Sequence, residues 1–313
     1  MARPAPLTLD PRAERRRRTA KVRESATAWA FVSPAALVIL GLSIVPVVWS
    51  FLLSFQSSDL LTPSTWVGLE NYRRLSDDPE FAEAVRNTLL YTVLYVPLSI
   101  LLGLVLALAL NRRIRFTGLY RTLMFVPFVV SATSQGVLFS FILDPQFGAA
   151  NSLLDRLGIG AQGFLTDPGQ ALLVLVGISV WSGTGFCVVI FLAALQDVPK
   201  ELTEAASLDG ANHWHVLRHV TLPALGPVSV FLVLWQTINA LQVFDLVYVT
   251  TKGGPLGSTT LVVYFVWEQA FKNFTAGYGA AAAYLVALAL LLLTVVPATA
   301  RRLRARRLKG AGA

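Results

Sequence analysis

Four polar residues stand out because they lie inside an apolar run of this chain. Gln236, Asn239, Gln242 and Asp245 follow one another at intervals of three within residues Ala224–Thr250. Amide and carboxylate oxygens hydrogen-bond the polar groups of a solute, and a charge within a membrane costs about 2.5–3.5 kcal/mol even on the lenient insertion scale. The row drifts by roughly 60° per step around a 3.6-residue helix, so we expect that not all four line one path. Gln242 and Asp245 are the better candidates for solute contacts, although Asp245 could instead be an interfacial residue that reaches external water.

A second group of residues could bind a metal. His213, His215 and His219 all lie in the segment Asp197–Pro223, and a spacing of four places two imidazoles on one helix face. No carboxylate or cysteine has a matching spacing. Cys187 is the only cysteine, which excludes an intrachain disulfide and a cysteine zinc cluster. We therefore expect no metal site.

These residues belong to a chain with the composition of a multi-spanning membrane protein. Of 313 residues, 55% are hydrophobic and 14% are charged, with a mean hydropathy of +0.61, whereas soluble domains carry about 25% charged residues. Six apolar runs are each long enough to cross a bilayer, which takes about 20 residues. They are Trp29–Phe55, Thr88–Leu110, Leu123–Leu143, Ala171–Leu195, Ala224–Thr250 and Gly277–Ala298. The prediction is an all-α membrane protein with six transmembrane helices.

The net charge of +8 sets orientation rather than indicating nucleic-acid binding. The two tails and the second and fourth connections together hold 20 basic residues against 7 acidic ones, which by the positive-inside rule places both termini in the cytoplasm. The run Arg15–Arg18 is interpreted as a topology determinant. The first apolar run is too long for a signal peptide and is expected to be retained. We expect a disordered basic tail over residues 1–27, a transmembrane domain over 28–300 with its core at 86–300, and a basic tail over 301–313.

The fourth connection, which holds the three histidines, is polar without being basic. Asp197 is expected to cap a short helix, Pro199 to lie in its first turn, and Gly210 to take the left-handed position just past its end. Ala205 and Ala206 share a face of that helix, where small side chains let another backbone approach. The pattern predicts a short exposed helix that docks a partner.

This connection carries the residues of a known signature. Glu204-Ala205-Ala206, then Gly210, then Val220 and Leu222-Pro223 resemble the EAA signature of permease subunits of bacterial ATP-binding-cassette (ABC) importers, with valine where isoleucine is commoner. The strings 66–72, 247–255 and 270–274 resemble the carbohydrate branch of that family, specifically its maltose-type first permease subunit. The resemblance covers about residues 30–300.

The resemblance implies a type I ABC importer permease fold and two sets of site residues. In that family the EAA segment, here 197–223, contacts the cytoplasmic ATPase. The coupling residues that it implies are Glu204, Ala205, Ala206, Asp209, Gly210, Leu222 and Pro223. The solute-pathway residues that it implies are Phe128, Gly183, Phe186, Gln242 and Asp245. Helix packing is the alternative role for Phe128 and Gly183. Ala132 stands where some relatives carry a hydroxyl, so the resemblance does not indicate which sugar this chain would transport.

The resemblance also implies partners and excludes a catalytic role. No lysine lies in a GxxxxGK[ST] loop, so ATP-Mg is expected on two copies of a separate ATPase subunit, and this chain is expected to hold no cofactor. A second homologous permease, an extracytoplasmic sugar-binding protein and membrane lipid complete the expected partners in the bacterial cell membrane. An amino-acid or peptide importer permease is the alternative. An ion-coupled secondary transporter would require an inverted repeat and ionisable residues at the midplane, and a membrane-embedded enzyme would require a nucleophile or metal constellation; no such features stand out in the sequence.

Overall fold

The computed structural model describes residues 24, 27–111 and 116–310, which divide into two units, Met1–Leu53 and Ser54–Ala313. The predicted disordered tail lies almost entirely outside the described residues, as do most of the basic turn 111–115 and the last three residues. The proposed domain boundaries therefore remain a prediction.

The first unit contains one apolar helical segment, Thr27–Leu53, which is 27 residues long and hydrophobic enough to span a membrane. It includes the π-helical turn η1 (Leu40–Ile44) and α2 (Val45–Leu53). The π-helical turn ends two residues before Pro46, which has no N–H to continue the regular helical hydrogen bonds. This segment confirms the predicted first span.

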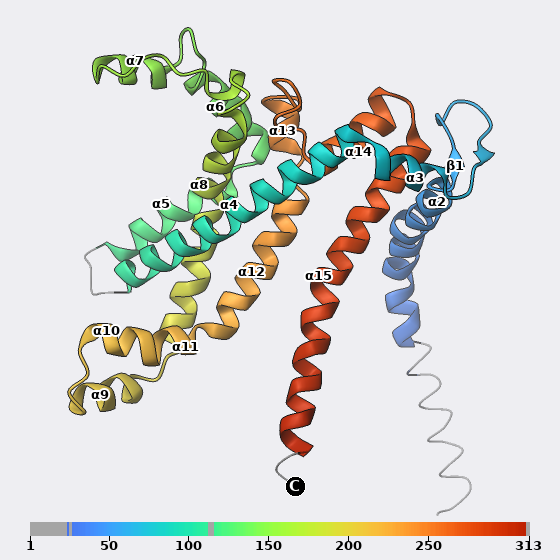
Figure 1. Ribbon diagram of the computed structural model, residues 1–313. Helices are drawn as coiled ribbons and strands as arrows, with labels where there is room; N and C mark the ends of the chain where they lie inside the picture. Colours follow the sequence, from blue (N-terminus) through green and yellow to red (C-terminus); the bar gives the residue numbers. More distant parts are fainter. Residues whose placement is uncertain (1–23, 25–26, 112–115, 311–313) are drawn as a thin grey trace, which may run out of the picture. The chain divides into compact units, whose positions relative to one another are not determined.

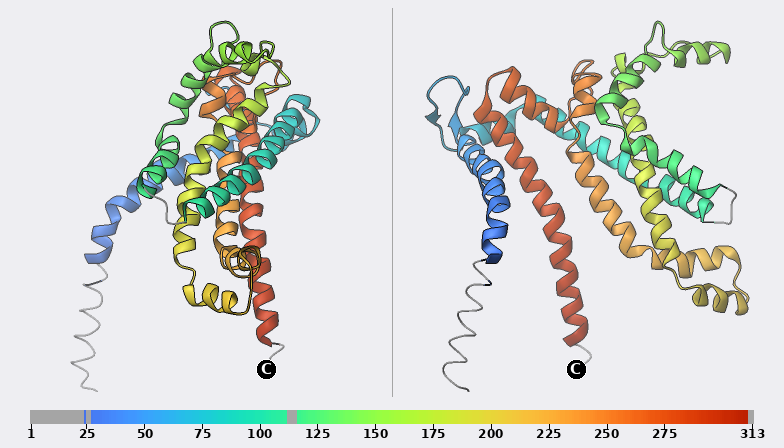
Figure 2. Two further views of the ribbon diagram at one scale, coloured as in Figure 1. Left: turned by 90° about the vertical axis from the view of Figure 1, so that its left-hand side faces the viewer. Right: turned by 180° about the vertical axis from the view of Figure 1, so that it is seen from behind.

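The second unit holds all the remaining elements (Figures 1 and 2). A two-stranded antiparallel ribbon, β1 (Gln56–Ser57) and β2 (Thr65–Trp66), comes first and pairs Gln56 with Trp66. The helices up to the fourth connection are α3 (Glu70–Asp77), α4 (Pro79–Leu110), α5 (Thr117–Val129), α6 (Ala132–Ile142), α7 (Ala149–Arg156), the 3-10 turn η2 (Phe164–Thr166) and α8 (Ala171–Gln196). Those that follow are α9 (Lys200–Leu208), α10 (His213–Val216), the π-helical turn η3 (Leu217–Thr221), α11 (Leu222–Ala224), α12 (Gly226–Leu241), α13 (Asp245–Val249), α14 (Val262–Trp267), the π-helical turn η4 (Glu268–Lys272) and α15 (Ala276–Gly310).

The six predicted spans are all present as apolar helices. Among the described residues, five helices are long and apolar enough to cross a membrane, and the bent pair α5–α6 makes a sixth when it is counted as one span. The predicted helical class is confirmed, and the β1–β2 ribbon is the one sheet in the part of the chain that the structure describes. The cytoplasmic placement of both termini remains a prediction.

The third span is not the continuous helix that its apolar run predicts. It starts at Thr117 and breaks between α5 and α6, which meet at an angle of 95°. Val130 and Ser131 adopt extended backbone conformations there. The hydroxyl of Ser131 accepts a hydrogen bond from the Ser134 N–H and so caps the start of α6, which is the usual role of serine at a helix N-terminus.

The fifth and second spans also differ from the prediction. The fifth is interrupted, because α12 ends at Leu241 and Phe244 leaves helical geometry with φ −132° before α13 begins. The second begins at Pro79, nine residues before the predicted Thr88. The Asp78 carboxylate accepts hydrogen bonds from two N–H groups of the first turn of α4, and this cap starts the helix before its apolar part.

Close packing of α8 against two neighbouring helices holds the centre of this unit together. A Cβ atom at Gly103 of α4 would collide with Cβ of Cys187 on α8, and one at Gly185 of α8 would collide with the Met124 carbonyl oxygen of α5. Small residues at such contacts let membrane helices approach closely. Above this contact, Tyr91 and Leu175 are fully buried in a core shared by α4 and α8.

Candidate functional site

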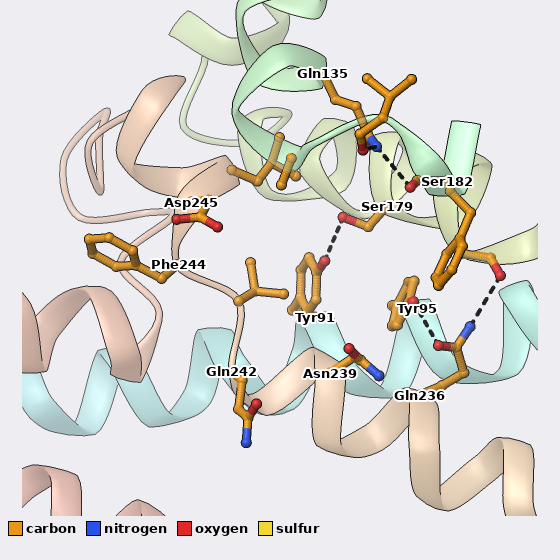
Figure 3. A pocket seen from close by; sticks show the side chains of 16 residues that line it. Tyr91, Tyr95, Gln135, Ser179, Ser182, Gln236, Asn239, Gln242, Phe244 and Asp245 are labelled. Carbon is orange, nitrogen blue, oxygen red and sulfur yellow. Dashed lines mark hydrogen bonds between the residues drawn. The ribbon is translucent and has the colours of Figure 1, made fainter. Parts of the chain in front are cut away.

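A cavity of about 260 Å³ lies where α4, the α5–α6 break, α8 and the α12–α13 break converge (Figure 3). Its polar lining consists of Tyr91, Tyr95, Gln135, Ser179, Ser182, Gln236, Asn239, Gln242 and Asp245. Its other lining residues are Phe128, Val130, Ala132, Gly183, Val243, Phe244 and Leu246. Hydroxyl, amide and aromatic groups therefore surround a space that contains one carboxylate and no basic side chain.

The structure brings four of the five predicted pathway residues to this cavity. Phe128, Gly183, Gln242 and Asp245 line it, although they come from three different spans. Phe186 does not line it. The Phe186 ring stacks instead on the Phe128 ring, with 5.1 Å between their centroids. Phe186 therefore packs against Phe128, which lines the cavity.

The expectation that the polar row on the fifth span cannot share one surface is wrong. Gln236, Asn239, Gln242 and Asp245 all line the same cavity. The predicted drift assumed a continuous helix, but Gln242 is the C-cap of α12 and Asp245 is the first residue of α13. The non-helical link between them redirects Asp245 toward the cavity, where its side chain is exposed (Figure 3).

Gln236 joins three helices at the floor of the cavity. Its side chain is buried, and its Oε1 accepts a 3.1 Å hydrogen bond from the Tyr95 hydroxyl of α4. Its Nε2 lies 3.4 Å from the Gly183 carbonyl oxygen and 3.2 Å from Sγ of Cys187, both on α8. A buried amide with partners on both sides fixes the relative positions of the helices that provide them.

Gln135 supports the break in the third span. Its buried Nε2 lies 2.9 Å from the Pro127 carbonyl oxygen and 2.8 Å from that of Val130. The break removes the helical donors that these carbonyls would otherwise have, and in an apolar setting such groups need another donor. The same Nε2 lies 3.0 Å from Oγ of Ser182 on α8. Gln135 thus keeps Phe128 and the start of α6 in place beside the cavity.

A row of aromatic rings continues from the cavity toward the end of the molecule that carries α9. Phe186 stacks on Trp235 of α12 with 5.5 Å between centroids, and Trp235 stacks on Phe231 at 6.1 Å. Phe128, Trp235 and Phe231 are all more than a third exposed in the isolated chain. The row forms an apolar surface directly below the polar cavity.

The EAA segment forms the predicted short helix, α9, with one difference at its start. Gly210 has φ +83°, which confirms the left-handed position expected just past the helix end. Asp197 does not cap this helix: it ends α8, and Pro199 occupies the N-cap position without a side-chain hydrogen bond. Asp197 cannot cap α9 because its backbone is still helical, at φ −83° and ψ −8°, whereas an N-cap residue has an extended backbone. The placement of Pro199 in the first turn is also wrong, because α9 begins one residue later, at Lys200.

The coupling residues that the signature implies are mostly exposed, and Glu204 is the one among them that lines a neighbouring groove. Glu204 and Ala205 are exposed, Ala206 is half-buried, and the N–H of Asp209 donates to the Ala205 carbonyl at 3.0 Å. Leu222 and Pro223 form α11, which leads into α12. Between α9 and the α10–η3 turn lies a groove of about 820 Å³, lined by Thr203, Glu204, Ser207, Leu208, Ala211, His213, Val216, Leu217 and Thr221.

The histidines do not form a metal-binding arrangement. The rings of His215 and His219 stack with 5.6 Å between centroids. Nδ1 of His215 lies 3.0 Å from the Asn212 side-chain oxygen, and Nδ1 of His219 lies 3.1 Å from the His215 carbonyl oxygen. Among the residues that the structure describes, no group of three or more histidine, cysteine, aspartate or glutamate side chains could hold a metal ion.

Sequence reasoning missed several polar lining residues that lie on other helices. Tyr91 and Tyr95 are four residues apart on α4, and the Tyr91 hydroxyl donates to Ser179 of α8 at 2.6 Å. Gln135 and Ser182 meet across two helices. The signal that could have found them is the one used for the fifth span, namely polar side chains within apolar runs, but their convergence depends on helix packing.

Comparison with known proteins identifies the class to which this fold and cavity belong. Residues 99–310 match the family model described as the binding-protein-dependent transport system inner membrane component. A probable ABC transporter permease of Pyrococcus horikoshii is 36% identical over 85% of this chain and 92% of its own length. The lactose transport system permease of Rhizobium radiobacter is 33% identical over 88% of this chain and 94% of its own length, and the trehalose/maltose transport system permease of Thermococcus litoralis is 32% identical over the same shares.

A solved structure shares the fold. The bacterial ABC transporter that imports the acidic polysaccharide alginate superposes with a TM-score of 0.80 and 22% identity, covering 91% of this chain and 99% of that one. The chain therefore belongs to the binding-protein-dependent transport system inner membrane components and is an ABC transporter permease. It is a multi-pass membrane protein and a transport component rather than an enzyme.

Proposed function

We propose that this chain is the permease subunit of an ATP-driven importer of uncharged carbohydrate and that the cavity below the α12–α13 break is its half of the sugar path. The observation that carries the proposal is the lining itself, in which nine hydroxyl, amide or carboxylate side chains and two phenylalanines surround the cavity. Oxygens and amides hydrogen-bond sugar hydroxyls, while aromatic faces cover the apolar surface of a sugar ring. Several relatives named for sugar transport, including those for lactose and trehalose/maltose, support the same class of solute.

The charges of the cavity favour a neutral solute over an amino acid or an acidic sugar. Asp245 is the one ionisable carboxylate in the lining, and no lysine, arginine or histidine lies there. An amino acid or an acidic saccharide would bring a carboxylate for which the lining holds no cationic partner, and the like charge of Asp245 would repel it. The cavity volume of about 260 Å³ lies just below the range typical of ligand pockets, about 300–1,000 Å³, which fits a wall completed by a second subunit.

Each predicted pathway residue has a role consistent with this solute. Gln242 and Asp245 are exposed at the α12–α13 break, where their side chains are available to sugar hydroxyls. Phe128 offers an aromatic face, backed by Phe186. Gly183 lets the floor form, because its missing side chain leaves room for the Tyr95 hydroxyl that donates to Gln236.

The α9 segment is the proposed contact with the ATPase. It is short, its residues are exposed or half-buried, and it is joined to α8 and α12, both of which line the cavity. A rigid helix held between two spans transmits the closure of an ATPase dimer to those spans, in the manner of a helix docked in a groove. Glu204, Ala205, Ala206, Asp209, Gly210 and the Leu222–Pro223 pair are the residues proposed to carry this coupling.

The remaining subunits follow from this assignment. We expect a second homologous permease to complete the path, two ATPase subunits to bind ATP-Mg, and an extracytoplasmic sugar-binding protein to deliver the solute. This chain itself is proposed to use no cofactor. With both termini and α9 on the cytoplasmic side, the α13–α14 end of the unit faces outward.

An uptake experiment tests the substrate class. The complex purified with its partner subunits is reconstituted in liposomes, and accumulation of radiolabelled neutral disaccharides, hexuronates and amino acids is compared with and without ATP on the ATPase side. ATP-dependent uptake of a neutral sugar is expected. Uptake driven by an ion gradient without ATP would favour the secondary-transport alternative, and ATP-driven uptake of an amino acid would replace the sugar assignment.

Paired variants test the site and the coupling segment. Gln242→Ala and Asp245→Ala should raise the KM for sugar while the complex assembles normally, and unchanged uptake kinetics would remove both from the path. Glu204→Gln should weaken ATPase docking, whereas Glu201→Gln, also exposed on α9 but outside the groove lining, should not. Equal ATPase co-purification and coupled hydrolysis in both variants would contradict the coupling role.

A further inference from the structure

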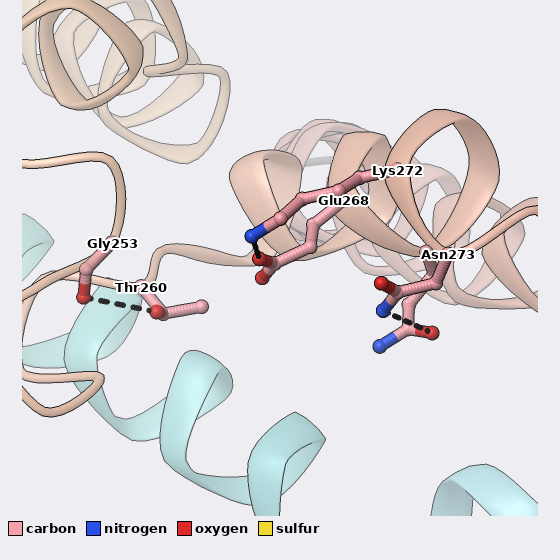
Figure 4. A network of polar contacts seen from close by, with 6 residues as sticks. Gly253, Thr260, Glu268, Lys272 and Asn273 are labelled. Carbon is pink, nitrogen blue, oxygen red and sulfur yellow. Dashed lines mark hydrogen bonds and ion pairs between the residues drawn. The ribbon is translucent and has the colours of Figure 1, made fainter.

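One arginine of the third span has a buried donor that this chain leaves without an acceptor. Arg121 lies in the second turn of α5, and its side chain is half-buried. Its Nε atom is enclosed by protein, yet no hydrogen-bond acceptor reaches it. Within the described part of the chain, the one ion pair joins Nζ of Lys272 to Oε1 of Glu268 at 2.6 Å (Figure 4). Because a buried charge is stable only when it is paired, we expect another molecule to supply the acceptor for Arg121.

Arg121 lies on the side of α5 that is turned away from lipid. Three apolar side chains of this helix are exposed, namely Leu119, Leu123 and Val126. At 3.6 residues per turn, each of them is roughly 140–160° around the helix from Arg121. Exposed leucine and valine side chains suit the hydrocarbon of a bilayer, so the lipid-facing side of α5 is the side opposite the arginine.

The face of α5 that carries Arg121 also forms part of the cavity wall. Arg121, Phe125 and Phe128 follow one another at intervals of four and three residues, which places them on one helix face. The rings of Phe125 and Phe128 have 5.4 Å between their centroids, and Phe128 lines the sugar cavity. Arg121 lies about 10 Å further along the helix axis. The arginine therefore extends the wall of the path beyond the cavity.

This extension runs toward the end of the unit that carries α9. The hydroxyl of Ser182 on α8 donates to the Pro127 carbonyl oxygen at 3.4 Å, whereas the Met124 carbonyl oxygen lies against Gly185. Earlier residues of α5 therefore lie beside later residues of α8, and α8 leads into α9. Arg121 precedes Met124, so it lies between the level of the sugar cavity and the proposed ATPase contact.

We infer that Arg121 forms an ion pair with an acidic side chain of the second permease subunit, on the α9 side of the sugar cavity. The inference rests on the proposed function, in which a second permease completes the wall to which Arg121 belongs. The guanidinium presents its N–H groups as a planar fork that matches the two oxygens of a carboxylate. A neutral sugar brings no charge to compensate it, and a lipid phosphate would approach from the opposite side of α5.

The same charge disfavours a second copy of this chain as the partner. In a two-fold symmetric pair each surface patch meets its own copy, so the wall that holds Arg121 would face a wall with the same arginine. The one carboxylate in the cavity lining is Asp245, which lies at the break between α12 and α13 rather than beside α5. A like-charge contact of this kind acts against the wrong partner, whereas an acidic partner surface satisfies it.

The ion pair also supplies a direction that the neighbouring apolar surface lacks. Phe231 and Trp235 are exposed on α12 in the isolated chain, and contacts between aromatic side chains tolerate displacement along the interface. A desolvated charge pair fixes the register of two surfaces more strictly, because a shift leaves both charges without a partner. Arg121 thus sets which subunit pairs with this chain and in what register.

Zero-length cross-linking of the whole complex in nanodiscs identifies the acceptor. Arg121→Lys places an amine within reach of the same carboxylate, and a water-soluble carbodiimide condenses the two into an amide while taking up the released water as a urea. Peptide mass spectrometry should show position 121 joined to an aspartate or glutamate of the second permease. Arg156→Lys, at an exposed position of α7, should give no link to that residue. A link from position 121 to lipid, to the ATPase or to a second copy of this chain overturns the inference, as does no link at all.

Assembly measurements provide the second test. Arg121→Gln should reduce the affinity of this chain for the second permease about tenfold or more, because the partner carboxylate is left unpaired, and Arg121→Lys should lose less. Arg218→Gln, at an exposed position of η3, is the control and should assemble normally. Arg121→Glu combined with an arginine in place of the cross-linked acid should restore assembly, which misfolding of α5 would not allow. Wild-type assembly of Arg121→Gln, or no restoration by the exchanged charges, refutes the ion pair, whereas failure of the wild-type complex to import sugar refutes the proposed function instead.

Discussion

The Tyr95 hydroxyl donates a 3.1 Å hydrogen bond to Oε1 of Gln236, so that α4 and α12 are joined across the floor of the cavity. This contact passes through the space that Gly183 of α8 leaves free, because a Cβ atom there would collide with the Tyr95 hydroxyl and lie 3.1 Å from Nε2 of Gln236. The lack of a side chain at one position of α8 therefore allows two other helices to meet.

Gly183→Ala is expected to destabilise the protein and impair sugar uptake. The added methyl must displace Tyr95 and break its bond to Gln236, and overpacking of this kind costs about 1–3 kcal/mol. Gly177→Ala on the same helix is the matched control, since no atom lies within 4 Å of its Cβ position. Thermal unfolding of the solubilised complex and uptake kinetics measure both effects, and equal behaviour of the two variants would contradict the close approach.

Gln236→Leu should lower the free energy of unfolding by about 1–3 kcal/mol, because the buried Tyr95 hydroxyl would lose its acceptor. Asn239→Leu serves as the control: Asn239 is exposed, and its Nδ2 donates to the Trp235 carbonyl of its own helix at 2.8 Å. Denaturant unfolding of the two variants gives the comparison. A loss no larger for Gln236→Leu than for Asn239→Leu would show that the three-helix contact does not stabilise the fold.

Gln135→Leu is expected to loosen the break in the third span. The carbonyl oxygens of Pro127 and Val130 would lose a donor at 2.9 and 2.8 Å, and unsatisfied carbonyls in an apolar region are costly. Amide hydrogen exchange should accelerate by about tenfold or more for residues 130–135, for a loss of about 1.4 kcal/mol or more. Unchanged exchange in this segment, with α8 as the internal reference, would remove Gln135 from this role.

The β1–β2 loop should lose its turn at low pH. The N–H groups of Thr62 and Leu61 donate to the Asp59 carboxylate and hold the pKa of Asp59 below its ordinary value. A lowered folded-state pKa means that this contribution is fully present above the ordinary aspartate pKa, about 3.9, and is lost as the pH falls through the folded-state value. The rate at which a protease cleaves the β1–β2 loop, measured across pH 2–6, reports the loss of this turn. Asp59→Ala should show fast cleavage throughout, and pH-independent protection of the unsubstituted protein would contradict this role.

The apolar helices and the short helix α9 were predictable because they depend on local properties. Whether a run such as Ala171–Gln196 crosses a membrane depends on its length and polarity, and both can be counted along the chain. The end of α9 was predictable from local properties too, because the residue just past a helix end commonly adopts the left-handed conformation that Gly210 has. The resemblance to ABC importer permeases named four pathway residues that share one cavity, namely Phe128, Gly183, Gln242 and Asp245.

The breaks in the third and fifth spans were not predictable from hydropathy. An apolar run remains apolar whether its helix is straight or bent. The bend at Val130–Ser131 persists because Nε2 of Gln135 and the hydroxyl of Ser182 donate to backbone carbonyl oxygens beside it. Tyr95 and Gln236 likewise meet only because helices 141 residues apart in sequence pack together. The sequence by itself therefore determined which segments form long apolar helices and where the short exposed helix α9 lies. Only the tertiary structure decided where those helices break and which polar groups face one another, since a polar side chain buried among apolar helices is stable only opposite a partner that packing supplies.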